Sequence, residues 1–388
     1  MHATVVRRDA HVGGVMLETL KKIGKVGASF AIRAYGNLVH VKWDVSRQKR
    51  KLVGYDSDIQ SVTQHLEASD GLFAIFVFYG PDGKVPADVT NALNALSSAS
   101  VHVLLVSNHK LSSAQTKAFA PMCHSMIERG NQGFDMGAYR DALQWITAKG
   151  LNPDRLIFLN NSVYYSHRGL SDFFVNLLGP EDAVAAFENW GEGHHLQSFA
   201  LSVSANILNA ECFTAFWDDY VPVNNRVHAI EAGERVLSHA VLTAADSSRV
   251  IYSVAALRDR LQAEGLDFAD SAPYLPQPIN SADLKRRDEL DGRTFTPEET
   301  AQHICDIISQ TSLIHSGAYF FARYLECPIF KKDIVYRRRF KFWQVEQWLG
   351  EVMPGAADRE AYLHLLRKRG DGAKFRGSDR IKYHLGVK

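Results

Sequence analysis

The sequence contains few cysteines and no long apolar run. Its four cysteines, Cys123, Cys212, Cys305 and Cys327, are scattered, and no two of them form a C-x-x-C pattern. This spacing argues against a zinc site and gives no disulfide framework, so we expect a reducing, cytoplasmic location. No apolar stretch is long enough to cross a bilayer, and charges run through the first 30 residues. The sequence therefore predicts neither a spanning helix nor an ordinary signal peptide.

Other absences narrow the class of protein. The chain has no G-x-x-x-x-G-K-(S/T) phosphate loop, which disfavours a nucleotide-dependent hydrolase or phosphotransferase. Hydrophobic residues make up 46% of the chain and charged residues 22%, values typical of a globular protein. The length of 388 residues exceeds a typical single core, so we expect one large α/β domain with appended helices, or two units.

Basic residues gather at the two ends of a chain whose net charge is only +1. The runs Arg47 to Lys51 and Arg337 to Trp343 have a composition that suits an anionic membrane surface or a phosphorylated lipid acceptor. A solvated basic face is the alternative interpretation. No recognised nucleic-acid-binding motif accompanies the charge, so nucleic acid is not an expected partner.

The segment from Glu128 to Asp141 is the most informative part of the sequence. Glycines, an amide, a carboxylate and an aromatic share one turn, at Asn131, Gly133, Asp135, Gly137 and Tyr139. Glycine permits φ > 0 or a close approach to a ligand, and Asn131 and Asp135 carry groups that hydrogen-bond ribose or sugar hydroxyls. Ligands of open α/β sheets collect where strands end and helices begin, which favours a nucleotide-sugar site. An ordinary turn that opens a helix over 138–146 is the alternative.

The rest of the chain alternates between strand and helix patterns. Buried strands are predicted at 72–79, 101–106, 156–159, 182–187 and 199–203, and helices at 85–96, 138–146, 207–220, 227–243, 297–310 and 342–352. This order predicts an α/β fold with a mainly parallel central sheet. Thr296 is the expected N-cap of the helix at 297–310. We expect a β-rich stretch at 26–41, a loop-rich segment at 250–295 and a poorly ordered basic tail at 370–388.

Five blocks stand in a fixed order along the chain. They read N-x-G-x-D-x-G-A-Y at 131–139, L-N-N-S-x-Y at 159–164, H-x-Q-S-F at 195–199 with Phe216-Trp217 after it, E-x-x-x-S at 234–238, and P-I-F-K at 328–331. In order and spacing they resemble the rhamnan synthesis protein F family of polysaccharide glycosyltransferases. The resemblance covers roughly residues 70 to 335.

The resemblance implies a GT-A-like, nucleotide-sugar-binding fold and a domain plan. Residues 1–69 are then an accessory N-terminal region, 70–335 the glycosyltransferase domain, and 336–388 a basic C-terminal helical extension and tail. The implied function is transfer of a sugar, rhamnose by family analogy, from a nucleotide-sugar donor to a glycan or lipid-linked glycan acceptor of a bacterial surface polysaccharide. The implied location is the cytoplasm, with peripheral contact to the inner face of the membrane.

Metal dependence stays open at this point. GT-A enzymes commonly hold Mg²⁺ or Mn²⁺ with a D-x-D carboxylate, so that the cation clamps the donor diphosphate. Here the position reads Asn160-Asn161-Ser162, which brings no charge, and Asp135 is the substitute ligand to consider. The alternative is cation-independent stabilisation by N–H groups, Arg129 or Arg140. The amides also keep a non-catalytic nucleotide-sugar- or glycan-binding protein of polysaccharide assembly as the competing function.

Deprotonation of an acceptor hydroxyl needs a carboxylate or imidazole within reach. The candidates are Asp135, Glu188, His195 and Glu234. Substrate hydrogen bonds are expected from Arg129, Asn131, Gly133, Gly137, Tyr139, Asn160, Asn161, Ser162, Gln197 and Ser198. Glu234 has an alternative interpretation as an exposed helical residue paired with Arg235 or His239, and His195 as a structural histidine. Trp190 and Trp217 are expected in the core rather than stacked on a sugar.

Overall fold

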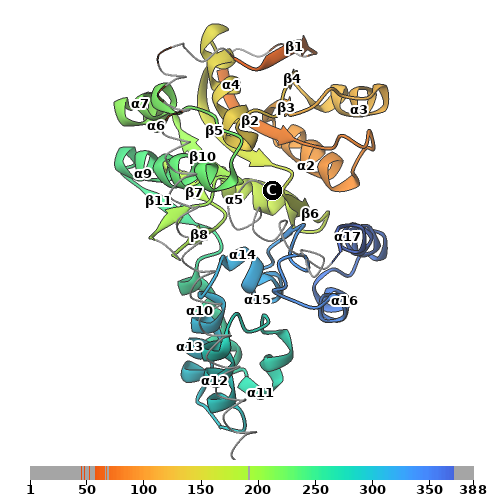
Figure 1. The fold of residues 1–388 in the computed structure, drawn as a ribbon, viewed down its shortest axis with the longest axis vertical. Coiled ribbons are helices and arrows are strands. Elements are labelled where there is room, and N and C mark those ends of the chain that lie inside the picture. Colours follow the sequence, from red (N-terminus) through yellow and green to blue (C-terminus); the bar gives the residue numbers. More distant parts are fainter. Residues whose placement is uncertain are drawn as a thin grey trace, which may run out of the picture. The chain divides into compact units, whose positions relative to one another are not determined.

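The computed structural model describes residues 45, 48, 52, 57–65, 67, 70–190 and 193–370. The chain divides into two compact units, one of residues 1–55 and 376–388 and one of residues 56–375. The second unit holds nearly all described residues and is drawn as a ribbon in Figure 1. The predicted β-rich stretch at 26–41 and the basic tail after residue 370 lie outside the described residues.

A mixed sheet forms the centre of the second unit (Figure 1). In spatial order its strands are β1 (Ile59–Gln64), β4 (Ser125–Arg129), β3 (His102–Ser107), β2 (Asp70–Phe78), β5 (Asn152–Asn160), β10 (Ala200–Ser204), β7 (Ala183–Ala185) and β11 (Ser248–Val250). Strands β4, β3, β2 and β5 run parallel, and β7 is parallel to β11. Strands β1 and β10 are antiparallel to their neighbours. The predicted α/β class with a mainly parallel sheet is confirmed.

Alternation along the central strands builds two apolar layers. In β2, Phe73, Ile75 and Val77 join one core cluster, whereas Ala74, Phe76 and Phe78 join the other, because successive side chains point to opposite faces. Helices cover both faces, which explains why these strands read as unbroken apolar runs.

The helices divide between the two faces as follows (Figure 1). One face carries α4 (Phe134–Ala148), α6 (Ala205–Leu208), α7 (Glu211–Asp219) and α9 (Arg235–Ala244). The other carries α2 (Ala87–Ser98), α3 (Ser113–Phe119) and α5 (Leu170–Leu177). Trp217 is buried on α7, as expected, but Trp190 is 57% exposed, so its predicted core position is wrong.

The prediction of a loop-rich segment at 250–295 is also wrong. It contains α10 (Val254–Glu264), α11 (Phe268–Ser271) and α12 (Ser281–Leu290). Ser253 and Asn280 cap the first turns of α10 and α12, while the three clustered prolines fall in the link between α11 and α12. Capping side chains start these helices and the prolines only separate them.

The remaining helices complete the C-terminal part of this unit. They are α13 (Pro297–Ile308), α14 (Leu313–Ser316), α15 (Ala318–Tyr324), α16 (Phe342–Val352) and α17 (Ala356–Arg369). Helix α13 begins as predicted, with Thr296 and Glu299 forming a reciprocal capping box, and α16 spans the predicted range. None of the helices in the described part of the chain combines the length and the apolar character needed to cross a bilayer.

The last two helices share the core of the sheet. Trp348 of α16 and Tyr362 of α17 are buried in the same cluster as one face of β2. In the first turn of α17, the Asp358 carboxylate accepts hydrogen bonds from the Tyr164 hydroxyl at 2.5 Å and the Ser166 hydroxyl at 2.6 Å. The predicted boundaries at 69/70 and 335/336 therefore fall inside one compact unit that runs from 56 to 375.

Candidate active site at the carboxyl ends of β4 and β5

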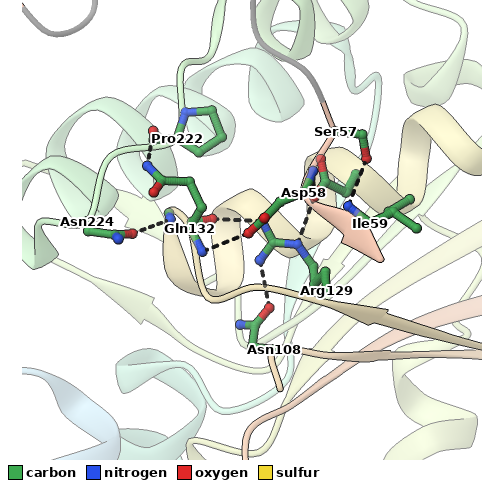
Figure 2. Close-up of polar contacts among 10 residues, drawn as sticks. Ser57, Asp58, Ile59, Asn108, Arg129, Gln132, Pro222 and Asn224 are labelled. Carbon is green, nitrogen blue, oxygen red and sulfur yellow. Dashed lines mark hydrogen bonds and ion pairs between the residues drawn. The ribbon is translucent and has the colours of Figure 1, made fainter. Parts of the chain in front are cut away.

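Arg129, the last residue of β4, holds the following turn together (Figure 2). Its Nε lies 2.7 Å from Asp141 Oδ2, its Nη1 donates to Asn108 Oδ1 at 2.7 Å, and its Nη2 donates to the Gln132 carbonyl at 2.8 Å. Asp58 lies 3.6 Å from Nη2. The Arg129 side chain is 0% exposed, so the structure places it as an internal brace and not, as predicted, on the substrate.

The two glycines of the turn serve the protein's own packing. Gly133 adopts φ +74, as the prediction of a permissive backbone requires, and it precedes the first residue of α4. A Cβ on Gly137 would lie 2.1 Å from the Gln132 carbonyl oxygen. The close approach that Gly137 allows is therefore to the turn before α4 rather than to a ligand. Asn131 is partly exposed at the start of the same turn.

Gly137→Ala is expected to lower the free energy of unfolding by about 1–3 kcal/mol, because the new methyl group meets backbone atoms that cannot rotate away. Chemical denaturation measures this change. Gly350→Ala in α16 is the matched control, since a Cβ at that position would have open space within 4 Å, and it should stabilise the protein by about 0.5–1 kcal/mol. Equal effects of the two substitutions would contradict the proposed packing.

A hydrogen bond joins the two motif-bearing turns. Asn160, the last residue of β5, donates from Nδ2 to Asp135 Oδ2 at 2.8 Å, and its Oδ1 accepts from the Ser162 amide at 3.0 Å. Asp135 stands in the first turn of α4. Burial raises the pKa of Asp135 to about 6, with Glu234 adding to the rise while Lys331 and Arg129 oppose it. The structure therefore places Asp135, Asn160 and Ser162, three of the candidate residues, next to one another.

Two predicted substrate ligands point elsewhere. The Asn161 amide extends the pairing of β2 and β5, because its Oδ1 accepts from the Tyr79 amide and its Nδ2 donates to the Tyr79 carbonyl, both at 3.0 Å. The Tyr139 ring is fully buried, and its hydroxyl donates to the Ser198 carbonyl at 3.2 Å. Both residues hold the frame of the site in this structure rather than face a ligand.

Lys331 is a site residue that the sequence interpretation missed. It ends β12 (Ile329–Lys331), which pairs antiparallel with β6 (Val163–Tyr165) so that Lys331 stands opposite Val163. Its Nζ donates to Ser162 Oγ at 3.1 Å and lies 4.0 Å from the centre of the Phe199 ring. Its position as the last residue of the P-I-F-K block was a sequence signal for a functional role. Nothing in the sequence indicated which of the other blocks its side chain would contact.

Hydrogen bonds join the H-x-Q-S block to the E-x-x-x-S block. Glu234, at the end of the π-helical turn η2 (Ala229–Glu234), accepts on Oε2 from the Ser198 amide at 3.0 Å and the Ser198 hydroxyl at 2.7 Å. Four residues later Ser238 accepts from the Leu196 amide at 2.7 Å. Residues four apart share one helix face, so one face of the helix aligns the whole 195–198 segment.

His195 lies beside the same carboxylate. Its Nε2 is 3.6 Å from Glu234 Oε1, and its Nδ1 is 3.1 Å from the Gly193 carbonyl. Burial works to lower the pKa of His195, but the Glu234 carboxylate and the Gly193 carbonyl together outweigh burial and raise the pKa. Burial likewise works to raise the pKa of Glu234, yet the nearby His195 imidazole and the hydrogen bonds from Ser198 hold this pKa below its usual value. Glu234 is thus a partly buried anchor, not an exposed partner of Arg235 or His239.

Gln197 and Trp190 are two further residues in and beside this segment. Gln197 is buried, and in the described part of the chain its Oε1 has no hydrogen-bond partner. Such an acceptor is rare in a folded protein, which fits the predicted substrate contact. Trp190 stands beside the strand β8 (Glu188–Asn189), with its ring 4.4 Å from that of His194. His194 in turn lies 2.9 Å from the candidate base Glu188.

The donor groups at the end of β5 do not fit a divalent cation. Such ions take several oxygen ligands, but the amide oxygens of Asn160 and Asn161 are already used within the protein, which leaves Asp135 as the carboxylate there. Among the described residues, no group of three or more His, Cys, Asp or Glu side chains is placed to hold a metal. The ammonium of Lys331 sits against the same turn.

Part of this chain is similar to a known protein family and to a protein of Sinorhizobium fredii. Residues 103–253 match the family described as rhamnan synthesis protein F. The predicted resemblance is confirmed. The matched segment contains the first four blocks, while the P-I-F-K block lies beyond it. The uncharacterized protein y4gN of Sinorhizobium fredii (strain NBRC 101917 / NGR234) is 27% identical over 175 residues, which are 44% of this chain and 45% of that protein. The match thus spans less than half the length of this relative.

Solved glycosyltransferase structures show distant likeness. GlyE of Streptococcus pneumoniae TIGR4 aligns at 13% identity over 56% of this chain and 51% of its own, with a TM-score of 0.28. TarS 1-349 of S. aureus aligns at 11% over 79% and 93%, with a TM-score of 0.32. The mannosyltransferase PcManGT of Pyrobaculum calidifontis, solved with GDP-Man and Mn²⁺, aligns at 8% over 88% and 96%, with a TM-score of 0.28. TM-scores this low carry no argument about the fold, and the fold assignment therefore rests on the strand order of the protein itself.

Proposed function

We propose that the protein is a GT-A-like glycosyltransferase that moves a sugar from a nucleotide-sugar donor to a growing bacterial surface polysaccharide. The observation that carries the proposal is the 2.8 Å hydrogen bond between Asn160 and Asp135, which joins two family blocks that follow the carboxyl ends of β4 and β5, two parallel strands of the same sheet. Ligands of open α/β sheets bind at this edge, where a helix begins. The rhamnan synthesis family match supports the polysaccharide as the product.

Sugar transfer requires departure of the nucleotide from the donor and deprotonation of the acceptor hydroxyl. The bond from the anomeric carbon to the diphosphate oxygen breaks, and its electron pair leaves on the nucleotide. A bond forms from the acceptor oxygen to the same carbon, and the proton of the acceptor hydroxyl passes to a carboxylate. A general base works best when its pKa lies near the working pH. Asp135, with a pKa of about 6, therefore suits this role better than Glu234, whose pKa is held low.

We assign the acceptor side to the 195–198 segment. Glu234 positions Ser198 and His195, and we assign a sugar hydroxyl as the donor to the buried Gln197 Oε1, which has no hydrogen-bond partner among the described residues. Exposed aromatic rings commonly pack on sugar faces, and Trp190 presents one next to this segment. Rhamnose as the transferred sugar, and peripheral membrane contact through the basic residues, are parts of the proposal that follow from the family resemblance and the charge.

A donor screen tests the function. Thermal unfolding of the purified chain is followed with dTDP-, UDP- and GDP-sugars, since a ligand that binds the folded state raises its stability. We expect one nucleotide class to raise the Tm, and release of that nucleoside diphosphate when a glycan acceptor is added. A Tm shift without release would favour the non-catalytic binding protein instead. No shift with any donor, alone or with acceptor, would contradict the proposal.

A further inference from the structure

Lys331 is held at the turn where the donor diphosphate is expected to bind. Its Nζ contacts Ser162, the third residue of the segment that stands where a D-x-D motif is expected. It also acts electrostatically on Asp135 and Glu234. The Phe199 ring supports the ammonium from one side at 4.0 Å, and the Tyr362 hydroxyl donates to the Lys331 carbonyl at 2.8 Å. Two independent contacts, from the residue just before β10 and from helix α17, thus fix the lysine at this edge.

The other cations that were candidates for this role are occupied by the protein. Arg129 is fully buried and bonded to Asp141, Asn108 and Gln132. Arg140 is buried, and its Nε donates to the Trp217 carbonyl at 3.1 Å. The neighbouring Lys332 forms a buried ion pair with Asp88 at 2.6 Å. Lys331, in contrast, is partly exposed, and its ammonium contacts a neutral hydroxyl and an aromatic ring.

We propose that the Lys331 ammonium binds the donor diphosphate in place of a divalent cation, so that sugar transfer by this protein is independent of metal. The inference rests on the proposed glycosyltransferase function and deepens it. A fixed positive charge at the oxygen where negative charge develops stabilises the departing nucleoside diphosphate, as a metal would. The neutral amides at 160 and 161 are then consistent with the site, because the charge comes from another strand.

The charge state of Lys331 suits this role. Burial lowers its pKa to about 8, although Asp333, Glu234 and Asp135 oppose the shift. The ammonium therefore remains largely protonated at neutral pH.

Calorimetric titration with dTDP, UDP and GDP tests the inference. Each titration is run in EDTA and again with MgCl₂ or MnCl₂. For the nucleotide that binds, we expect the same Kd in all conditions. Lys331→Met should weaken its binding about 10- to 100-fold, the effect typical of losing a charge-assisted contact, and leave the affinity for the matching nucleoside unchanged. Lys331→Arg, which keeps the charge, should restore most of the loss.

The controls separate this inference from the function beneath it. Lys117→Met, at an exposed position on α3, should bind like the wild type. Diphosphate binding by the wild type that requires Mg²⁺ or Mn²⁺, or unchanged binding by Lys331→Met, overturns the metal-independent role and leaves the glycosyltransferase standing. Absence of binding by the wild type in every condition overturns both. The EDTA comparison uses the unaltered chain, so it holds even where a substitution impairs folding.

Discussion

Asp135→Asn is expected to lower the turnover number about 10²- to 10⁴-fold, the range contributed by a positioned general base. The amide keeps the shape of the side chain but cannot take the acceptor proton. Because the substitution leaves Lys331 in place, affinity for the nucleoside diphosphate should stay near that of the wild type. The measurement is a steady-state assay of nucleotide release together with a binding titration.

The pH profile gives this variant a second readout. With a pKa of about 6 in the folded protein, Asp135 is ionised above that pH, so kcat/KM of the wild type should rise between pH 5 and 7. The rising limb should be absent from Asp135→Asn. The free energy of unfolding should fall over this pH range, while kcat/KM rises. The folded state binds this proton more tightly than the unfolded chain, so ionisation of Asp135 costs stability as pH rises through about 6, and the variant should escape that cost.

Asp154→Asn serves as the control for this prediction. Asp154 lies near the other end of the same strand β5 and is exposed, so the substitution should change neither turnover nor the pH profile. Full activity in Asp135→Asn would remove Asp135 as the base. An equal loss of turnover and of nucleotide affinity would instead indicate a binding role. An inactive but equally or more stable variant is the result that our assignment requires.

Arg129→Met is expected to lower the free energy of unfolding by about 3–5 kcal/mol, the usual cost of leaving one partner of a buried ion pair without the other. Arg129 and Asp141 are both 0% exposed and lie 2.7 Å apart, and the substitution also removes the donors to Asn108 and Gln132. Guanidinium denaturation followed by circular dichroism measures the change.

The pH dependence of Arg129→Met follows from the same pair. Burial raises the pKa of Asp141, and Arg129 opposes the rise. Without the arginine the folded-state pKa lies higher still. The folded variant then takes up a proton more readily than the unfolded chain, so the loss of stability should be smaller at pH 5 than at pH 8.

Two further variants test the explanation. Arg260→Met breaks a surface pair with Glu264 at 2.7 Å, in which Arg260 is 55% exposed, and should cost at most about 1 kcal/mol. Combining Arg129→Met with Asp141→Leu removes both buried charges and should recover part of the stability, because no lone charge remains inside. A double variant as unstable as the sum of the single variants would contradict a direct interaction between the two residues.

Local sequence patterns predicted much of the fold. The apolar runs at 72–79 and 101–106 become β2 and β3, because strands covered on both faces need apolar side chains in every position. Thr296 caps α13 through a local capping box, which requires only four neighbouring residues. The clustered prolines at 250–295 predicted loops there, whereas the capping side chains of Ser253 and Asn280 start helices α10 and α12.

By itself, the sequence determined the strands, most of the helices and the family resemblance, and it named Asp135, Asn160 and Ser162 as candidates, because each of these depends on neighbours close along the chain. Only the tertiary structure decided what those residues face. Arg129, Asn161 and Tyr139 carry chemistry suited to a ligand, yet they bond to groups of the protein that come from distant segments. Lys331 is separated from Ser162 by 169 positions, and only the pairing of β12 with β6 brings its charge to the site.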